Sequence, residues 1–143
     1  MADGKQVLVT GMAGQIGGII RRFLGEKYDL SGVDRAPVED CPSVVADLSD
    51  LKAIRPAFEG IDVVVHLAAY LGGADFEGPP SGNLVGAYNV YEASRLAGVK
   101  RVVFASSGTA AGGFERIAPY DAIVVAASGP SVPDELVAQL NGG

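Results

Sequence analysis

The sequence predicts an α/β fold, a three-layer sandwich in which helices cover both faces of a parallel sheet of about six strands. Two observations indicate it. Short apolar runs, such as those within 6–10 and 61–67, alternate along the chain with longer segments of helical periodicity. Such alternation is typical of right-handed strand–helix–strand units, and continuous apolar runs are typical of strands buried on both faces. The 20 glycines and the 48% hydrophobic content suit one compact domain over 1–143.

The order of the elements follows from these patterns. We expect strands at residues 6–10, 29–33, 43–46, 61–67, 101–105 and 120–126, in the spatial order 3-2-1-4-5-6. Apolar residues recur at spacings of three and four in further segments, which predicts helices there. These helices are expected at 15–25, 51–58, 83–97 and 131–140, with an interruption of the second at Pro56. The glycines and prolines within 68–82 predict a loop.

The first expected strand and helix are joined by the glycine-rich turn Gly11-x-x-Gly14-x-x-Gly17. A strand, a glycine turn and a helix in this order direct free backbone N–H groups and the positive end of the helix toward a phosphate. Gly11 permits the tight turn, Gly14 lets the backbone approach a pyrophosphate, and Gly17 lets the helix lie close to the strand. The spacing differs from Gly-x-Gly-x-x-Gly, so a glycine-rich turn without a ligand is the alternative.

Further polar residues are expected at the carboxyl ends of the strands, where open parallel sheets bind ligands. Asp34 follows the glycine turn at about the distance at which dinucleotide folds place the acid that binds the adenosine ribose. Its neighbour Arg35 leaves room for a 2′-phosphate, but the acid favours NAD over NADP. Other expected strand ends carry Asp47, Ala68-Ala69 and Ser106-Ser107. The sequence therefore predicts a Rossmann-type sandwich with a dinucleotide as its ligand.

Charge and composition argue against several classes of partner. A net charge of −6 and a pI near 4.6 argue against nucleic acid and against anionic membranes. No apolar run approaches the roughly 20 residues of a membrane span, and no basic segment precedes an apolar one as in a secretory signal. Cys41 is the single cysteine, so neither an intrachain disulfide nor a metal site is expected. We therefore expect a cytoplasmic protein.

Five motifs over residues 5–107 together resemble the extended short-chain dehydrogenase/reductase family of NAD-dependent epimerases, dehydratases and sugar or uronate dehydrogenases. They are Thr10-Gly11-x-x-Gly14-x-x-Gly17, Asp47-Leu48, Asp62-x-x-x-His66-Leu67-Ala68-Ala69, Asn83-Leu84-Val85-Gly86-x-x-Asn89-Val90 and Phe104-Ala105-Ser106-Ser107. The resemblance implies that the second motif contacts adenine, that the third flanks the nicotinamide ribose, and that the fifth carries a catalytic serine. The expected cofactor-binding residues are Gly11, Gly14, Gln15, Ile16, Gly17, Asp34, Arg35, Asp47, Leu48, Leu67, Ala68 and Ala69.

The Tyr-x-x-x-Lys pair that this family places after the serine does not follow Ser107. The last lysine of the sequence is Lys100, and Tyr120 is followed four residues later by Val124. In the family the tyrosine acts as the acid/base, and the lysine lowers its pKa and holds the ribose. Ser107 is therefore the one candidate that remains of the catalytic set.

Residues 113–143 resemble a fragment of protein-L-isoaspartate O-methyltransferase. The resemblance rests on Ala118-Pro119-Tyr120-Asp121 and on Val132-Pro133-x-x-Leu136-x-x-Gln139-Leu140. The glycine turn that would bind S-adenosylmethionine is missing upstream, so this cofactor is not expected. Two signatures in one sheet suggest a designed or recombined chimera with its junction at 108–112. A natural relative whose tail matches by chance is the alternative.

Three functional hypotheses follow. We favour an engineered or recombined protein that keeps an NAD site but lacks complete catalytic machinery, because no acid/base pair accompanies Ser107. The alternatives are an active NAD-dependent oxidoreductase or epimerase acting on a sugar or uronic acid, and an inert folded scaffold without a ligand. His66 lies in an apolar run and is interpreted as a hydrogen-bonded core residue, not as a base. Tyr70, Tyr88 and Tyr91 are likewise interpreted as packing residues and not as acids.

The resemblance also predicts how copies of the chain associate. In the resembling dehydrogenases, the helix that corresponds to 83–97 packs against the helix that carries the tyrosine–lysine pair, and that second helix is not found here. Leu84, Tyr88 or Tyr91 would then lie exposed, which is uncommon on a stable monomer. Either the expected 131–140 helix covers this face, or two chains pair through it. We favour a homodimer.

Overall fold

The computed structural model describes residues 4–70, 80–106 and 123–125. The chain forms two compact units, Met1–Val102 and Val103–Gly143. The elements of the first unit are β1 (Gln6–Thr10), α1 (Gln15–Leu24), β2 (Asp29–Asp34), β3 (Ser43–Val45), α2 (Leu51–Ile54), the 3-10 helix η1 (Arg55–Phe58), β4 (Val63–His66) and α3 (Pro80–Ala97). The strand β5 (Arg101–Ser106) begins in the first unit, and in the second unit it pairs with β6 (Ile123–Val125).

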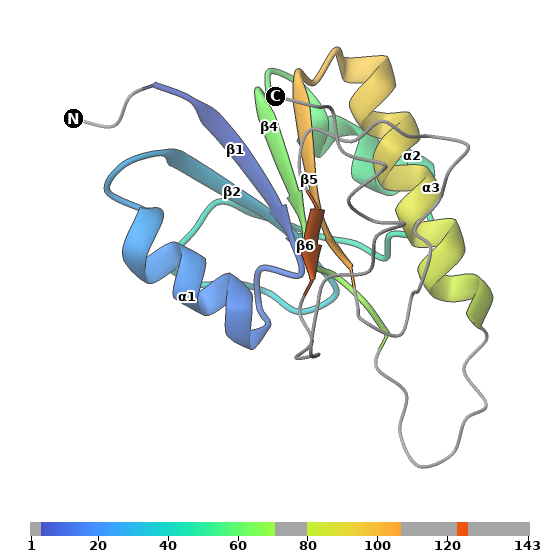
Figure 1. Cartoon of the computed structure of the whole chain (residues 1–143), viewed down its shortest axis with the longest axis horizontal. Coiled ribbons are helices and arrows are strands. Elements are labelled where there is room, and N and C mark those ends of the chain that lie inside the picture. Colours follow the sequence, from blue (N-terminus) through green and yellow to red (C-terminus); the bar gives the residue numbers. More distant parts are fainter. Residues whose placement is uncertain (1–3, 71–79, 107–122, 126–143) are drawn as a thin grey trace. The chain divides into compact units, whose positions relative to one another are not determined.

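The strands pair in the order β3-β2-β1-β4-β5-β6, which confirms the order predicted from the sequence. In the first unit β1 lies between β2 and β4, and Val9 has Gly32 on one side and Val65 on the other (Figure 1). β2 pairs in parallel with β3, and β5 pairs in parallel with β6. Because the pairing is parallel, β1, β2, β3 and β4 all end at the same edge of the sheet.

The two faces of the sheet in the first unit pack against different helices. Successive residues of a strand point to opposite faces. Leu8 points to one face, where β1, β2, α2, η1, β4 and α3 form a core cluster. Its buried members are Leu8, Val33, Ile54, Phe58, Val64, Val90 and Ala93. The other, reached by Val7 and Val9, includes the partly buried Ile20 of α1. Helix α1 therefore covers one face and α2 and α3 the other, as in a three-layer sandwich (Figure 1).

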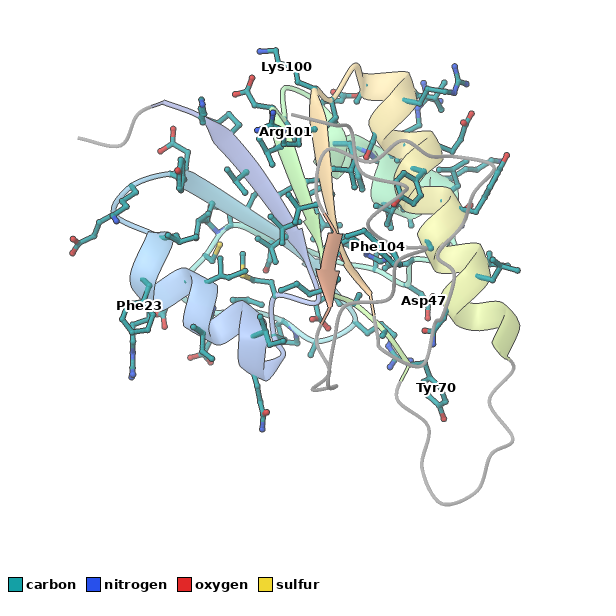
Figure 2. The ribbon with its side chains drawn as sticks, in the orientation of Figure 1. Phe23, Asp47, Tyr70, Lys100, Arg101 and Phe104 are labelled. Carbon is teal, nitrogen blue, oxygen red and sulfur yellow. The ribbon has the colours of Figure 1, made fainter. Side chains whose placement is uncertain are left out.

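Helix α1 is rotated from the orientation expected of its apolar residues. The apolar residues Ile16, Ile19, Ile20, Phe23 and Leu24 have the spacing of one helix face, which would be expected to pack on the sheet. Three of them, Ile16, Ile19 and Phe23, are instead 48%, 56% and 66% exposed. Gly17 faces the sheet instead and is buried. A Cβ at Gly17 would lie 2.5 Å from the carbonyl oxygen of Met12, so the helix approaches the chain here as closely as its backbone allows. This contact turns the remaining side outward, and Figure 2 shows Phe23 pointing away from the sheet.

Two helix boundaries also differ from those expected. α3 begins at Pro80 and not at 83. Proline is well suited to the start of a helix, because the N–H that it lacks would have no acceptor within the helix at that position. The expected helix 51–58 is α2 followed by η1, which contains Pro56; a proline has no N–H to continue an α-helix. The expected helix 131–140 and the junction 108–112 lie outside the described residues.

Candidate functional site

The turn after β1 lies close to the ends of two other strands, because the residue that makes the approach, Gly11, has no side chain. Gly11 has a φ of +76°, in the left-handed region that favours glycine. Its N–H donates to the carbonyl oxygen of Val33 at 2.9 Å, which ties the turn to the end of β2. A Cβ at Gly11 would lie 2.8 Å from the backbone nitrogen of Ala68, just after β4. The glycines predicted to make a close turn therefore do so, and they bring the ends of β1, β2 and β4 together.

Gly14 stands at the N-terminus of α1 with its surface exposed. It occupies the N-cap position at a φ of −74°, and no side chain caps the helix. A Cβ on Gly14 would meet a single neighbour within 4 Å, the Gly11 carbonyl oxygen at 3.2 Å. The first N–H groups of a helix have no acceptor within it, so those of Gln15 and Ile16 are available to an anion. The first turn of α1 carries no acidic side chain that would repel one.

Asp34, at the end of β2, lies beside this turn. Its Oδ2 accepts a hydrogen bond from the N–H of Ala13 at 2.9 Å, and its Oδ1 accepts one from the N–H of Ala36 at 3.1 Å. A carboxylate has about four acceptor positions, so these two bonds orient Asp34 and leave capacity for a hydroxyl donor. The acid therefore lies where a ribose next to a bound pyrophosphate could reach it.

Asp47 follows β3 in a turn that its own side chain helps to close. Its Oδ1 accepts a hydrogen bond from the N–H of Ser49 at 2.8 Å. Hydrogen bonds from the backbone and the side chain of Ser49 lower the pKa of Asp47, and the charge of Arg35 adds to this effect. Two consecutive carbonyl oxygens of the turn, those of Leu48 and Ser49, accept from Nδ2 of Asn89 at 2.8 and 3.0 Å.

Tyr70 adds an aromatic ring at the same edge. Figure 2 shows Asp47 and Tyr70 at this edge and Lys100 at the opposite one. The guanidinium carbon of Arg35 lies 6.0 Å from the centroid of the Tyr70 ring. The Asn83 side chain accepts from the Tyr70 N–H at 2.6 Å and donates to the Tyr70 carbonyl oxygen at 3.0 Å. The interpretation of Tyr70 and Tyr88 as packing residues is wrong, since these residues are 45% and 66% exposed. The long-range Asn83 contact has no local sequence pattern that would have revealed it.

A buried pair, Thr10 and His66, lies beneath the edge. Thr10 Oγ1 and His66 Nδ1 are 2.6 Å apart, and the N–H of Ala68 donates to the same hydroxyl at 3.3 Å. Burial lowers the pKa of His66 to about 4, so the imidazole is neutral near pH 7. This confirms the interpretation of His66 as a hydrogen-bonded core residue. The pair holds the backbone after β4 under the glycine turn.

The first unit therefore brings together at one edge every expected cofactor-binding residue. These are Gly11, Gly14, Gln15, Ile16 and Gly17 after β1, Asp34 and Arg35 at β2, Asp47 and Leu48 after β3, and Leu67, Ala68 and Ala69 after β4. Ser107 lies outside the described residues. Within the described ranges, no group of three or more His, Cys, Asp or Glu side chains could hold a metal ion. None of the helices in that part of the chain is long and apolar enough to cross a membrane.

Comparison with known proteins gives a family and several enzymes. Residues 7–133 match the NAD dependent epimerase/dehydratase family. Uronate dehydrogenase of Agrobacterium fabrum is 41% identical over 125 residues, covering 80% of this chain and 46% of that protein. L-arabinose 1-dehydrogenase (NAD(P)(+)) of Haloferax volcanii is 39% identical over 103 residues, covering 71% of this chain and 41% of that protein. The chain thus spans less than half the length of these two relatives.

A solved structure shows the same similarity. The crystal structure of a uronate dehydrogenase mutant from Agrobacterium tumefaciens complexed with NAD matches with a TM-score of 0.64 at 34% identity. The match covers 91% of this chain and 49% of that one.

The family match runs through the expected junction at 108–112 and on to residue 133. The comparisons therefore give no support to a chimera or to a methyltransferase fragment at 113–143.

Proposed function

Because this chain belongs to the NAD dependent epimerase/dehydratase family, we propose that the edge formed by β1, β2, β3 and β4 binds NAD. The observation that carries the proposal is the exposed N-terminus of α1 at Gly14, with the Asp34 carboxylate hydrogen-bonded to the same turn. The pyrophosphate would accept from the first N–H groups of the helix, and Asp34 would accept from the adenosine ribose. Asp47 and Leu48 would contact the adenine.

NAD is proposed as the preferred dinucleotide. A 2′-phosphate would place its negative charge against the Asp34 carboxylate, which is already fixed by two backbone N–H groups. The Arg35 guanidinium could offset that charge, but it lies over Tyr70 and close enough to Asp47 to lower its pKa. Redirecting Arg35 to a phosphate would cost these contacts, so NADP should bind more weakly.

The reaction proposed for the whole protein is the oxidation of a sugar or uronic acid. The two relatives are dehydrogenases of such compounds, and bound NAD would supply the hydride acceptor. The residues at the edge bind and orient the dinucleotide, and the backbone at Leu67–Ala69 would flank the nicotinamide ribose. Ser107 remains the catalytic candidate. The two other hypotheses predict different results. A protein without catalytic machinery would bind NAD but form no NADH, and an inert scaffold would not bind NAD.

A calorimetric titration with NAD, NADP and S-adenosylmethionine tests the binding proposal. We expect saturable binding of NAD, weaker binding of NADP, and none of S-adenosylmethionine. No heat with NAD would overturn the proposal and favour an inert scaffold. Formation of NADH with uronic acids or aldoses, followed by absorbance, then tests the reaction. NAD binding without NADH from any of these substrates would favour binding without catalysis.

Two further predictions concern the protein as a whole. Leu84 and Tyr88 on α3 are each 66% exposed, which supports the proposal that two chains pair through this helix. Tyr91, which the sequence placed on the same face, is partly buried. Dimerisation and a cytoplasmic location both remain predictions.

A further inference from the structure

The turn between β3 and α2, residues 47–50, directs its hydrogen-bonding groups in two directions. The Asp47 side chain accepts from the N–H of Ser49 at 2.8 Å, and Asp50 Oδ1 accepts from the N–H groups of Lys52 and Ala53 at 3.0 and 3.1 Å. The two acids thus hold this turn and the start of α2 from the solvent side. The carbonyl oxygens of Leu48 and Ser49 are bound from elsewhere, by a side chain of α3.

That side chain is Asn89, which is 6% exposed. Its Nδ2 donates to the carbonyl oxygens of Leu48 at 2.8 Å and of Ser49 at 3.0 Å, so one amide group binds two consecutive peptides. One turn earlier on the same helix, Gly86 lets α3 approach the turn: a Cβ there would lie 3.3 Å from Cβ of Leu48. Helix α3 therefore holds the turn through one amide group that donates twice and through one close contact.

We propose that Asn89 is a positioning residue for the adenine end of the dinucleotide site, which it serves without touching the ligand. The inference rests on the proposed NAD site, because Asp47 and Leu48 are the residues assigned to the adenine. By fixing the Leu48 and Ser49 peptides, Asn89 fixes the N–H that Asp47 accepts and the direction of the Asp47 carboxylate. The nicotinamide end, near Leu67–Ala69, does not depend on this turn.

The chemistry of the position explains why an amide is needed. Two carbonyl oxygens require two donors from one short, uncharged side chain, and the Asn NH₂ group supplies both. Leucine has the same branching at Cγ and no donor, so Asn89→Leu takes the donor away from two carbonyl oxygens in a part-buried site. The turn must then move toward solvent, and the Asp47 carboxylate moves with it.

The experiment separates the two halves of the dinucleotide. NMR titrations with AMP and with nicotinamide mononucleotide are compared for wild type, Asn89→Leu and Ser94→Ala. Ser94 is the matched control, because it is 3% exposed on the same helix but its Oγ donates only within that helix, to Val90 at 2.7 Å. We expect Asn89→Leu to weaken AMP about tenfold and to leave nicotinamide mononucleotide unchanged. Ser94→Ala should change neither. Unchanged AMP affinity, or equal weakening of both nucleotides, would overturn the proposal.

A second variant covers the case in which Asn89→Leu does not fold. Gly86→Ala keeps the amide and favours the helix, but its methyl group presses on Leu48. It should weaken AMP about threefold with nicotinamide mononucleotide unchanged, and equal affinity to wild type would count against the proposal.

A ligand-free measurement distinguishes this inference from the proposed function. If wild type binds neither NAD nor AMP, the proposed site fails, but the positioning role is still testable by NMR titration of the Asp47 carboxyl. The hydrogen bonds from Ser49 hold the pKa of Asp47 below its usual range. Asn89→Leu should raise it and Ser94→Ala should not, whereas an unchanged pKa in Asn89→Leu would refute the positioning role.

Discussion

Acidification is expected to destabilise the folded protein through His66. The side chain is 3% exposed, and its burial lowers the pKa to about 4 from the 6.5 of an exposed histidine. Between these two values the unfolded chain takes up a proton that the folded protein does not, so stability falls with pH in this window. At a pH well above 6.5 both states are neutral and nothing is lost. The loss is about 2 kcal/mol at pH 5 and about 3 kcal/mol near pH 4.

Urea unfolding of wild type and His66→Asn at several pH values between 7 and 4 measures this effect. Asparagine does not titrate in this range, and its side chain can still pair with the Thr10 hydroxyl. Carboxylates such as Asp47, whose pKa is lowered in the folded state, also lose stabilisation as the pH falls, but they do so in both proteins. The difference in unfolding free energy between the two proteins therefore isolates His66. Parallel pH dependences would refute the reasoning.

Three further predictions concern the turn, the ribose acid and association. Gly17→Ala should lower the free energy of unfolding by about 2 kcal/mol or more, because its Cβ would lie 2.5 Å from the Met12 carbonyl oxygen. Gly18→Ala, whose Cβ would make only an ordinary contact of 3.9 Å with the Arg21 side chain, should raise it by about 0.5–1 kcal/mol in the same urea titration. Asp34→Ala should weaken NAD by about 1–3 kcal/mol in calorimetry, and unchanged affinity would exclude a ribose contact. Light scattering should show a dimer that Tyr88→Glu converts to a 14.6 kDa monomer; a monomeric wild type would contradict pairing through α3.

The strand order and the residues at the site edge were predictable because both follow from local patterns. Continuous apolar runs such as Val63–His66 identify buried strands, and the loops that follow them carry the polar residues. From their spacing Gly11 was assigned to the tight turn and Gly17 to the close approach of helix and strand, and both have contacts that exclude a Cβ. Parallel pairing then places the strand ends at one edge without further information.

The orientation of α1 and the contacts of α3 could not be predicted in this way. Periodicity shows that Ile16, Ile19 and Phe23 share a helix face, but the face that meets the sheet is decided by Gly17, which has no side chain to count. The bonds from Asn89 join residues 40 and 41 positions apart along the chain and end on backbone carbonyls. Carbonyls have no sequence signature, so such contacts appear only in three dimensions.

A calorimetric titration of NAD into wild type, Gly14→Val and Gly18→Ala tests the central claim most directly. Gly14 is exposed at a φ that any residue can adopt, and a Cβ there would meet one neighbour, the Gly11 carbonyl oxygen at 3.2 Å. Gly14→Val should therefore fold with a small loss of stability, while its side chain covers the N–H groups assigned to the pyrophosphate. We predict binding to wild type and to Gly18→Ala, and no binding to Gly14→Val although urea unfolding shows that this variant is folded. Equal NAD affinity in all three proteins, or none in wild type, would contradict a dinucleotide site at this turn.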